Sequence, residues 1–441
     1  MRNVPIFPAY LDLEPWQQGS FRFETALPGS KSLTLRDCAI AALADGVSTV
    51  RFPGEADDYW RMKDCLRRLG IDVDDSQDEQ VRITGRGGRF GAGRIELDVG
   101  QSAVTARLML AFAALRPDVT VIDGHISMQN RPNKDLTDAL QALGARIDAA
   151  RDGHLPSTVT GARLKGPVRV PGNISSQYLT SLLTIAPLVD GGLTIDVEGE
   201  LTSKPYIDLT LDEMAKFGVE VDNQRYRRLV VRGQPYRAGV VPVEGDASAA
   251  SYFAALATLH GAQITLSNLG VGTRQGDYAF LGLCEKLGAR VTRAAGSTAI
   301  EGPRALSANF DGAVDMTSMP DVAPTLMMIA PLLSKATRIA GLATLRVKEC
   351  DRIAAPTREL RKLGVTVEEG PDYMVIQPLD GAANRPRVVE IETYHDHRIA
   401  MSFGVLGSRL PGLRILDPGC VAKTYPNYWR DWERARSAAR P

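Results

Sequence analysis

A short pattern that joins a helix end to a strand recurs five times along this chain and constrains its fold most. In each copy a Leu or Phe precedes a glycine, and apolar and polar residues alternate after it. A glycine there suits the left-handed residue that ends a helix, and the alternation is typical of a half-buried strand. The glycines are Gly70, Gly144, Gly218, Gly288 and Gly364, separated by 74, 74, 70 and 76 residues.

So regular a period indicates one α/β unit used repeatedly. The 441 residues have room for about six such units and are too many for one ordinary core. We therefore expect an α/β fold of two domains, each with three copies of the unit. A generic helix–glycine–strand junction, common in α/β proteins, is the alternative interpretation.

The composition argues against several classes of protein. Basic and acidic residues balance, 52 against 52, so the broadly basic surface of a nucleic-acid-binding protein is not expected. The five cysteines are scattered, odd in number and form no C-x-x-C pair, which argues against a disulfide framework or a zinc knuckle and fits a reducing cytoplasm. Neither a signal peptide nor a membrane-spanning apolar stretch is evident. We expect a cytoplasmic protein that binds neither nucleic acid nor membrane.

Residues 28–32, PGSKS, form a turn that leads into a helical sequence. Lys31 stands at the expected helix start, where free backbone N–H groups and the helix dipole favour an anion. Ser32 and Arg36 are four residues apart and so share one helical face. The segment is not a Walker loop, because the G-x-x-x-x-G-K-[ST] spacing is missing. It predicts a seat for a negatively charged small molecule; a helix capped by Ser30 is the alternative.

Further segments of the first half place polar or basic residues at expected helix starts. Arg131 lies just before a proline and a helical sequence. Ser175, Ser176 and Gln177 follow a Pro-Gly turn, and Ser203 lies in LTSKPYIDLT. Serine hydroxyls and backbone N–H groups at a helix start can hold a phosphate. Taken singly, each segment is more simply explained as an N-cap.

The second half of the chain adds acidic and basic residues, mostly in turns. They are Asp321 in SMPDVAPT, Lys348, Glu349 and Arg352 in LRVKECDR, Arg398 in TYHDHRIAMSFG and Lys423 in DPGCVAKTYPNYW. Lys348 and Arg352 are expected on one helical face, so a salt-bridged face is the alternative there. It does not explain why so many basic residues fall at element starts. A metal site at His395 and His397 has no support from another histidine or cysteine cluster.

In this order, the segments resemble those of the enolpyruvyl transferases, and most closely those of 5-enolpyruvylshikimate-3-phosphate synthases. The motifs are LPGSKS…R, RP before a helix, SSQ, SKPYID, VEGDAS, PD, RVKE.DR, DHR.AM and AKT.P, and they span nearly the whole chain. The resemblance implies two domains of three repeated βαβαββ units each, with the active site in the cleft between them. Residues 29–243 are expected to form the central domain, and residues 1–28 with 244–441 the discontinuous one.

The resemblance also implies the chemistry. The enolpyruvyl group of phosphoenolpyruvate passes to the 5-hydroxyl of shikimate 3-phosphate, and phosphate is released. The hydroxyl adds to C2 while C3 is protonated, and the tetrahedral intermediate then loses phosphate. One group must accept a proton and another must donate one. By match to the family motifs, Asp321 resembles the acceptor, Glu349 the donor, and Lys31 a catalytic residue between the two anions.

The other matches divide by ligand, and arginine suits them because its planar fork meets carboxylate or phosphate oxygens in pairs. No metal or organic cofactor is implied, and we expect a monomer. Contacts to shikimate 3-phosphate are implied for Lys31, Ser32, Arg36, Asp321 and Lys348, with its phosphate on Ser175, Ser176 and Ser203 and with Gln177 between both ligands. Ala103, Arg131, Arg352, Arg398 and Lys423 match positions against phosphoenolpyruvate.

One departure from the family pattern concerns an inhibitor. The family usually has N-A-G-T where this chain has residues 101–104, QSAV, so that Ala103 replaces the glycine against phosphoenolpyruvate. An extra methyl group narrows the pocket. Some family members with alanine here tolerate glyphosate, which is slightly longer than phosphoenolpyruvate, so we predict weakened inhibition by glyphosate.

Other departures bear on the acceptor. Thr344, Leu345 and Val104 differ from the usual residues, through neutral drift or because the chain is a paralogue that acts on another alcohol in a specialised pathway. A UDP-N-acetylglucosamine enolpyruvyl transferase is disfavoured, because the loop before the RP pair lacks a cysteine. A catalytically inactive binding protein is disfavoured because Asp321 and Glu349 are both present.

Overall fold

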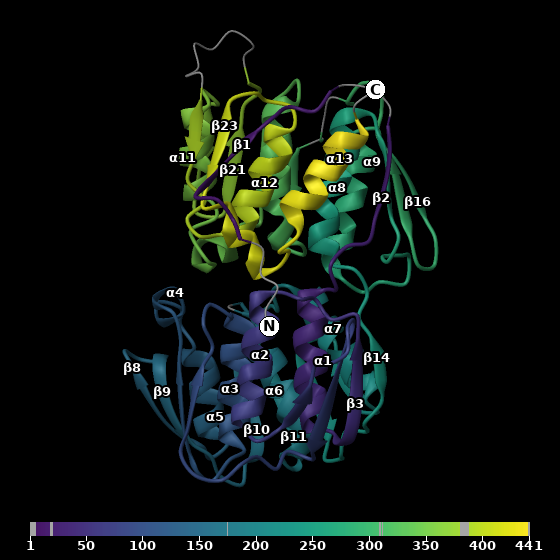
Figure 1. Ribbon diagram of the computed structural model, residues 1–441. Helices are drawn as coiled ribbons and strands as arrows, with labels where there is room; N and C mark the ends of the chain where they lie inside the picture. Colours follow the sequence, from purple (N-terminus) through teal and green to yellow (C-terminus); the bar gives the residue numbers. More distant parts are fainter. Residues whose placement is uncertain are drawn as a thin grey trace. The chain divides into compact units, whose positions relative to one another are not determined.

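The computed structural model describes residues 6–17, 21–173, 175–307, 310, 312–379 and 388–439. Its contacts divide the chain into two compact units, each with its own buried hydrophobic core. The central unit is Gly29–Glu244, drawn from purple to teal in Figure 1, and the discontinuous unit is Gly245–Pro441 with Met1–Pro28. Among the described residues, no helix is long and apolar enough to cross a membrane.

In its described part, the central unit has three four-stranded sheets built on one plan: a parallel pair of strands, then two antiparallel strands on one side of it. The strand orders are β14-β3-β5-β4, β6-β7-β9-β8 and β10-β11-β13-β12. The strands are β3 (Asp45–Arg51), β4 (Asp72–Asp74), β5 (Gln80–Arg86), β6 (Ile95–Asp98), β7 (Val119–Asp123), β8 (Arg146–Ala150), β9 (His154–Thr160), β10 (Lys165–Pro171), β11 (Asp190–Glu198), β12 (Val221–Gln224), β13 (Arg228–Arg232) and β14 (Val240–Pro242). The helices are α1 (Lys31–Leu43), α2 (Asp57–Arg68), α3 (Ala103–Ala114), α4 (Ile126–Gln129), α5 (Lys134–Ala142), α6 (Ser176–Ile185) and α7 (Lys204–Lys216).

The described residues of the discontinuous unit repeat this plan twice in full and once with three strands. The strand orders are β16-β17-β15-β2, β18-β19-β21-β20 and β1-β23-β22. The strands are β1 (Tyr10–Leu13), β2 (Arg22–Thr25), β15 (Gln263–Leu266), β16 (Arg290–Arg293), β17 (Thr298–Glu301), β18 (Ala313–Asp315), β19 (Thr337–Ala340), β20 (Val367–Glu369), β21 (Tyr373–Ile376), β22 (Val389–Ile391) and β23 (Leu413–Leu416). The helices are α8 (Ala247–His260), α9 (Phe280–Lys286), α10 (Ala323–Ile329), α11 (Ala354–Lys362), α12 (His397–Gly407) and α13 (Tyr428–Ala438), with short 3-10 helices η2 (Gly276–Ala279), η3 (Pro320–Val322), η5 (Ala343–Val347) and η6 (Pro418–Lys423).

A strand stands just before each of the two chain connections and pairs within its own unit. β2 precedes α1 in the sequence but pairs with β15, whereas β14 precedes α8 but pairs with β3. The strand before the first connection thus completes a sheet of the discontinuous unit, and the strand before the second connection completes a sheet of the central unit. The connections lie at Pro28/Gly29 and Glu244/Gly245.

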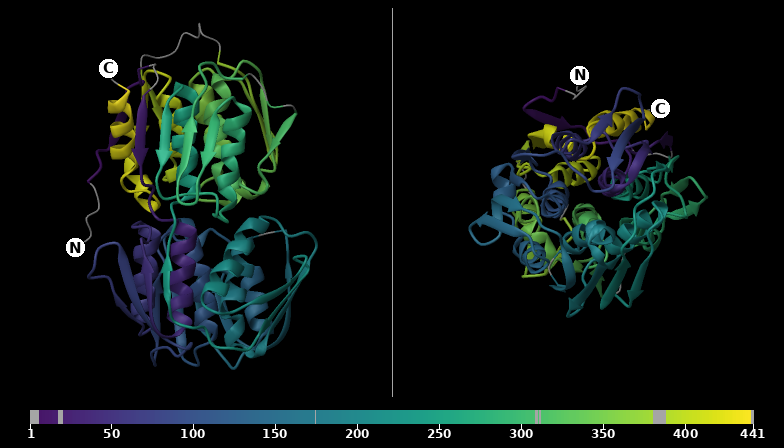
Figure 2. Two further views of the ribbon diagram at one scale, coloured as in Figure 1. Left: turned by 90° about the vertical axis from the view of Figure 1, so that its right-hand side faces the viewer. Right: turned by 90° about the horizontal axis from the view of Figure 1, so that it is seen from below.

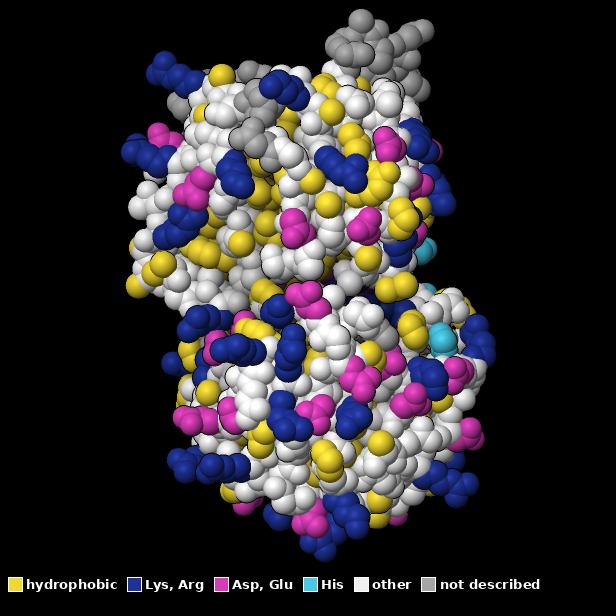
Figure 3. All heavy atoms as spheres, turned by 180° about the vertical axis from the view of Figure 1, so that it is seen from behind, with side chains coloured by type: hydrophobic (Ala, Val, Ile, Leu, Met, Phe, Trp, Pro, Cys, Tyr) yellow, Lys and Arg dark blue, Asp and Glu magenta, His cyan; other side chains and the backbone are white. Residues whose placement is uncertain are grey.

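Helices fill the inside of each unit. In α1 every residue from Leu33 to Leu43 is buried, and α12 is buried over its whole length. A helix buried on all sides belongs inside a fold. Figure 2 shows the strands of the central unit around its helices, and the face in Figure 3 shows Lys and Arg side chains interspersed with Asp and Glu.

The five repeated glycines have the predicted helix-ending role. Their φ angles are 80° at Gly70, 118° at Gly144, 81° at Gly218, 100° at Gly288 and 82° at Gly364. After α2, for example, the backbone N–H of the residue that follows the glycine donates back to the helix, from residue 71 to residue 66, at 3.1 Å. This bond is the mark of a Schellman motif. The prediction of one α/β unit used repeatedly is thus confirmed.

Parallel pairing brings distant loops to one edge of each sheet. Pro171 at the end of β10 lies opposite Glu198 at the end of β11. In the discontinuous unit, Asp315 of β18 lies opposite Ala340 of β19, and Ile391 of β22 opposite Ile415 of β23. Loops that follow such strands start side by side, which is where α/β proteins place their ligands.

The core of the central unit contains a buried pair of acids between α1 and α7. Asp37 and Glu213 are 0% and 1% exposed, and Lys216 Nζ lies 2.8 Å from Glu213 Oε1. Burial and the Glu213 carboxylate raise the pKa of Asp37 well above its ordinary value, against the opposing charges of Lys216 and Arg36. Folding therefore favours the protonated form of Asp37.

We predict that alanine destabilises the protein more when it replaces a glycine at a left-handed position than when it replaces a glycine elsewhere. An added Cβ would meet no atom within 4 Å at Gly144 or at Gly239, but only Gly144 has a positive φ. Gly144→Ala should lower the free energy of unfolding by about 1–2 kcal/mol, and Gly239→Ala should leave it unchanged or raise it by up to about 1 kcal/mol. Urea unfolding followed by circular dichroism checks both variants, and equal effects would contradict the explanation.

We also predict that Asp37→Asn stabilises the protein at neutral pH. A group whose pKa is raised by folding lowers stability as the pH rises from the unfolded pKa to the folded one, and asparagine has no proton to lose. The free energy of unfolding at pH 7 should rise by roughly 1–3 kcal/mol, the size of a buried polar penalty. The gain should shrink as the pH falls toward about 4. Urea midpoints at both pH values test this, and a gain independent of pH would contradict it.

Candidate active site

Two acidic residues of the discontinuous unit follow the two strands of one parallel pair. Asp321 lies in η3 after β18, and Glu349 lies just after η5, which follows β19. Because those strands end at one edge of the sheet, the two carboxylates reach the same place. Their side chains are 17% and 13% exposed, so both are open to a small ligand while largely surrounded by protein.

Arg352 joins these two acids to a third one. Its Nη1 donates to Asp321 Oδ1 at 3.2 Å, and its Nη2 donates to Glu349 Oε2 at 2.7 Å. Its Nε and Nη2 donate to both oxygens of Asp396, at 2.7 and 3.1 Å. The arginine side chain is 1% exposed. Burial alone would lower the pKa of Arg352, but the three carboxylates raise it above its ordinary value, so the guanidinium is always charged.

Asp396 has a second role at the start of a helix. It is the N-cap of α12, and its Oδ1 accepts a hydrogen bond from the backbone N–H of Arg398 at 2.9 Å. An acid at an N-cap satisfies a backbone donor and complements the helix dipole. One fully buried carboxylate therefore fixes both Arg352 and the helix turn that presents Arg398.

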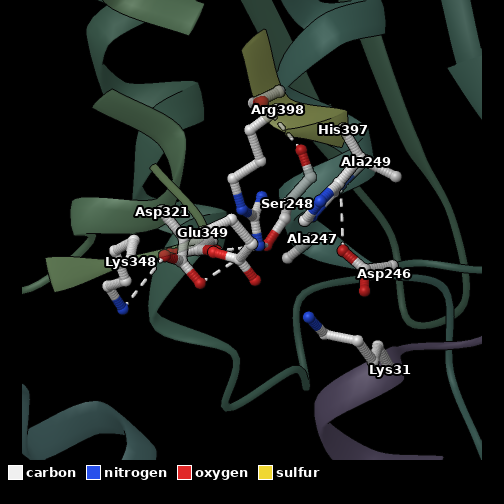
Figure 4. A network of polar contacts seen from close by, with 12 residues as sticks. Lys31, Asp246, Ala247, Ser248, Ala249, Asp321, Lys348, Glu349, His397 and Arg398 are labelled. Carbon is white, nitrogen blue, oxygen red and sulfur yellow. Dashed lines mark hydrogen bonds and ion pairs between the residues drawn. The ribbon is translucent and has the colours of Figure 1, made fainter. Parts of the chain in front are cut away.

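Three more cations surround the acidic pair, and Figure 4 shows two of them, Lys348 and Arg398. Lys348 Nζ lies 3.4 Å from Asp321 Oδ1, and Arg398 Nη2 lies 3.1 Å from Asp321 Oδ2. Lys423, at the end of η6, places its Nζ 3.5 Å from the Oε1 of Glu349. Four cations thus face three carboxylates, and an added anion would find an excess of positive charge.

One local expectation about this segment is wrong. Lys348 and Arg352 do not share a helical face, because η5 ends at Val347 and α11 begins only at Ala354. The Asp351 carboxylate accepts from the backbone N–H groups of residues 353 and 354, at 2.9 and 3.0 Å, and starts the new helix. The segment between η5 and α11 directs the side chains of Lys348 and Arg352 toward Asp321.

In the central unit, Lys31 is the first residue of α1, as predicted. Its Nζ lies 3.6 Å from Asp58 Oδ2, and its side chain is 16% exposed. Ser30 makes no capping hydrogen bond, so a serine cap does not explain this helix start. Gly29 is needed for space, since a Cβ there would come within 2.2 Å of the Phe52 carbonyl oxygen.

Arg36 binds groups of three helices. It donates to the Ser32 carbonyl of α1 at 2.8 Å, to Thr210 Oγ1 of α7 at 2.9 Å and to Thr180 Oγ1 of α6 at 3.4 Å. Burial lowers the pKa of Arg36 to about 10, so it remains charged at neutral pH. The guanidinium thus ties α1 to α6 and α7, the two helices whose starts carry the predicted phosphate-binding serines.

A second buried arginine, which the sequence analysis gave no role, holds Gln177. Arg107 of α3 donates to Gln177 Oε1 and to Asn133 Oδ1, the latter at 3.2 Å. It also lies over the Tyr178 ring, 5.0 Å from its centroid. These contacts join α3 to the loop before α5 and to the first turn of α6. Arg107 lies near the start of α3, but only contacts between distant segments reveal that it holds Gln177.

The predicted serines differ in what they do. Ser175 caps α6, and its Oγ accepts from the Gln177 N–H at 3.3 Å; Ser176 is the first residue of that helix and is 9% exposed. Ser203 precedes α7 with φ 55°, and its side chain makes no capping bond. A left-handed residue other than glycine is costly and is found preferentially at functional sites.

Two remaining predicted residues lie near helix starts. Ala103 is the first residue of α3, after its N-cap Ser102, and is 7% exposed. Arg131, 8% exposed, lies two residues before the N-cap of α5. Among the described residues, no group of three or more His, Cys, Asp or Glu is placed to hold a metal ion.

One of the three departures from the family pattern lies in the core. Leu345 is fully buried in the hydrophobic cluster of the discontinuous unit, so it packs against protein. Thr344 and Val104 are partly exposed.

Comparison with known proteins gives one family. The family model for EPSP synthase (3-phosphoshikimate 1-carboxyvinyltransferase) matches residues 17–432. The 3-phosphoshikimate 1-carboxyvinyltransferase of Ralstonia pickettii is 39% identical over 428 residues, covering 95% of this chain and 98% of that protein. The chloroplastic protein of that name from Petunia hybrida is 39% identical over 440 residues, covering 96% and 84%.

Solved structures agree. EPSP synthase from Acinetobacter baumannii superposes with a TM-score of 0.79 at 26% identity, covering 96% of this chain and 97% of that one. The enolpyruvyl transferase NikO from Streptomyces tendae gives a TM-score of 0.73 at 15% identity and so supports the fold alone. The resemblance and fold class predicted from the nine motifs are confirmed. The chain belongs to the EPSP synthase family, the 3-phosphoshikimate 1-carboxyvinyltransferases, and has the two-domain enolpyruvyl transferase fold.

Proposed function

We propose that this chain transfers the enolpyruvyl group of phosphoenolpyruvate to the 5-hydroxyl of shikimate 3-phosphate, with Asp321 and Glu349 as the pair that moves protons. The observation that carries the residue assignment is that both carboxylates touch one buried arginine, Arg352. Two acids held at fixed positions among cations are what an addition with proton transfer at both ends requires.

The proposed reaction has two steps, an addition and an elimination. In the first step the oxygen of the 5-hydroxyl bonds to C2 of phosphoenolpyruvate, and Asp321 takes the hydroxyl proton. Glu349 gives a proton to C3, which becomes a methyl group. In the second step the C2–phosphate bond breaks, a proton leaves the methyl group, and the vinyl ether and phosphate are released. Glu349 is the base for that proton, since it is ionised after the first step. The proton that Asp321 took from the hydroxyl leaves with the phosphate, so both carboxyl groups return to their starting states.

Positive charge makes both steps possible. Lys348, Arg352, Arg398 and Lys423 are bound to carboxylates in the structure, and the carboxylate and phosphate of phosphoenolpyruvate would compete for them. Planar guanidinium groups meet such oxygens in pairs. A substrate anion beside Glu349 also favours the protonated form that must donate.

For the central unit we propose the binding of shikimate 3-phosphate. Helix starts that carry serine supply hydroxyls and backbone N–H groups for its phosphate, and Lys31 lies between the charges of the two substrates. Arg36 contributes by tying α1 to α6 and α7. We assign the phosphate to Ser175, Ser176 and Ser203 and the cyclohexene ring to Ser32. Gln177 is assigned a place between the two ligands, and Ala103 and Arg131 the phosphoenolpyruvate side.

We propose further that the enzyme acts as a monomer in the cytoplasm. All five cysteines are free thiols, which suits a reducing compartment. The proton-transfer pair and its four cations come from one chain. Light scattering on purified protein gives the oligomeric state directly.

Glyphosate tolerance is part of the proposal. The methyl group of Ala103 stands at the first residue of α3, where the family usually has a glycine against phosphoenolpyruvate. The inhibitor is slightly longer than the substrate, so one methyl group discriminates against it. A change of one carbon in a tight pocket is worth about 10–200-fold.

We predict that Asp321→Asn and Glu349→Gln each lower kcat by about 10²–10⁴-fold, because each removes one proton transfer. Phosphate release at saturating substrates measures this. In D₂O, product from the unaltered enzyme should carry deuterium in its vinyl group, because C3 passes through a freely rotating methyl group.

The matched control for these two variants is Asp315→Asn. Asp315 is an exposed acid six residues before Asp321, and its carboxylate accepts only from the N–H and hydroxyl of Thr317 among the hydrogen bonds seen in the described residues. Its activity should match the unaltered enzyme. Full activity in Asp321→Asn or Glu349→Gln would contradict the assigned roles.

We predict that Ala103→Gly restores sensitivity to glyphosate. The concentration for half inhibition should fall by about 10-fold or more, while the KM for phosphoenolpyruvate changes less. Val104→Thr, the neighbouring departure from the family pattern, serves as the control and should not change inhibition. Equal inhibition of the unaltered enzyme and Ala103→Gly would sink the proposal.

A further inference from the structure

A buried acid outside the proton-transfer pair is linked to it through two side chains. Asp277 lies in η2 and is 5% exposed. Its Oδ2 is hydrogen-bonded to Ser248 Oγ, and its Oδ1 has no hydrogen-bond partner among the described residues. Buried carboxylates normally satisfy both oxygens, so this acid needs an explanation.

The link continues from Ser248 to Asp321. Arg398 Nη2 donates to Ser248 Oγ at 3.3 Å, and the same nitrogen lies 3.1 Å from Asp321 Oδ2. Figure 4 shows Ser248, Arg398 and Asp321 in this chain of contacts. Asp277, Ser248, Arg398 and Asp321 come from η2, α8, α12 and η3, so four separate elements of one unit meet here.

The donor and acceptor properties of these side chains fix the direction of each hydrogen bond. A guanidinium group only donates hydrogen bonds, and a serine hydroxyl has a single proton. Ser248 Oγ accepts from Arg398, so its own proton points to Asp277. The serine hydroxyl donates a stronger hydrogen bond to an ionised Asp277 than to a neutral one. That bond keeps the lone pairs of the serine oxygen turned toward Arg398.

Asp277 is not required to anchor its own loop. Gln275, two residues earlier, accepts from the N–H of Ala247 at 3.0 Å and donates to the Gly245 carbonyl at 2.7 Å. These two bonds already fasten the loop to the start of α8. The carboxyl group of Asp277 is therefore available for another purpose.

We propose that Asp277 is a positioning residue for the reaction: through Ser248 it orients Arg398, and its charge makes Asp321 a stronger base. The inference rests on the proposed function, in which Asp321 accepts the proton of the hydroxyl. Asp277 itself touches neither substrate nor the reacting atoms.

Charged groups around Asp277 give the expected pH dependence. Asp246 at the start of α8, Asp321 of η3 and Arg398 of α12 all act on it. Burial and the Asp321 carboxylate raise the pKa of Asp277 to about 6, against the effect of Arg398. Above that pH Asp277 is ionised, and its negative charge favours protonation of Asp321. Below it, Asp277 is neutral, Ser248 loses its fixed direction, and activity falls.

The test is the dependence of kcat on pH for the unaltered enzyme, Asp277→Asn and Ser248→Ala. The unaltered enzyme should show an acid limb near pH 6 that belongs to the coupled pair of acids. Asp277→Asn should shift that limb down by about one pH unit or more and lower kcat on the plateau by roughly 10-fold. Ser248→Ala should raise the KM for phosphoenolpyruvate several-fold, because Arg398 loses an oriented acceptor.

Asp431→Asn is the matched control. Asp431 of α13 is a buried acid of the same unit and accepts a hydrogen bond from Tyr425, which lies just before that helix. Its replacement should leave the pH profile unchanged. An Asp277→Asn enzyme with an unaltered profile would overturn the inference. If that variant does not fold, Ser248→Ala decides, since an unchanged KM would overturn it equally.

The roles of Asp321 and Asp277 can be tested separately. If Asp321→Asn is active, the proposed proton acceptor is wrong and this inference falls with it. If Asp321→Asn is inactive while Asp277→Asn keeps the normal pH profile, only the role of Asp277 is wrong.

Discussion

The buried ion pair between Arg352 and Asp396 is the interaction on which the arrangement of the candidate active site depends. Both side chains are almost fully withdrawn from solvent, where an unpaired charge is so costly that removing one partner typically destabilises a protein by about 3–5 kcal/mol. Each member also holds a second group: Arg352 binds Asp321 and Glu349, and Asp396 caps the helix that carries Arg398. The pair, which the protein needs for stability, thus also fixes the positions of the groups proposed to take part in the reaction.

The repeated fold explains how groups from distant parts of the sequence reach this pair. Each sheet has a parallel pair of strands whose ends lie at one edge, and the loops that leave this edge carry Asp321, Glu349, Arg398 and Lys423. In the central unit the same plan brings together the starts of α6 and α7, which carry the predicted serines. One α/β unit, used repeatedly, therefore supplies both the groups proposed to transfer protons and the helix ends proposed to bind anions.

Features decided by local chemistry could be predicted from the sequence. A glycine after a helix needs a positive φ wherever it stands, so the five junctions and the repeated fold followed from spacing alone. Lys31 at the start of α1 followed from its turn. The expected helix through Lys348 and Arg352 was wrong, because the Asp351 side chain starts a new helix that spacing does not reveal. The motifs supplied the site residues, whose roles stay predictions.

Features decided by contacts between distant segments could not be predicted. Asp277 and Ser248 are 29 residues apart, and Ser248 and Arg398 are 150 apart; no period or motif in the sequence joins them. Arg107 gained its role only through Gln177 and Asn133. Leu345, which differs from the family pattern, proved to be a core residue. In each case burial and hydrogen bonding, which depend on the whole fold, decide what the side chain does.

The central claim is that the acceptor of the enolpyruvyl group is shikimate 3-phosphate. The most direct measurement is phosphate release from phosphoenolpyruvate with and without shikimate 3-phosphate, with the product examined by proton NMR. We predict rapid release that requires the acceptor, and the two vinyl protons of an enolpyruvyl ether. No turnover by folded protein that binds phosphoenolpyruvate would contradict the claim, and Thr344 and Val104 would then be the first positions to examine for another alcohol.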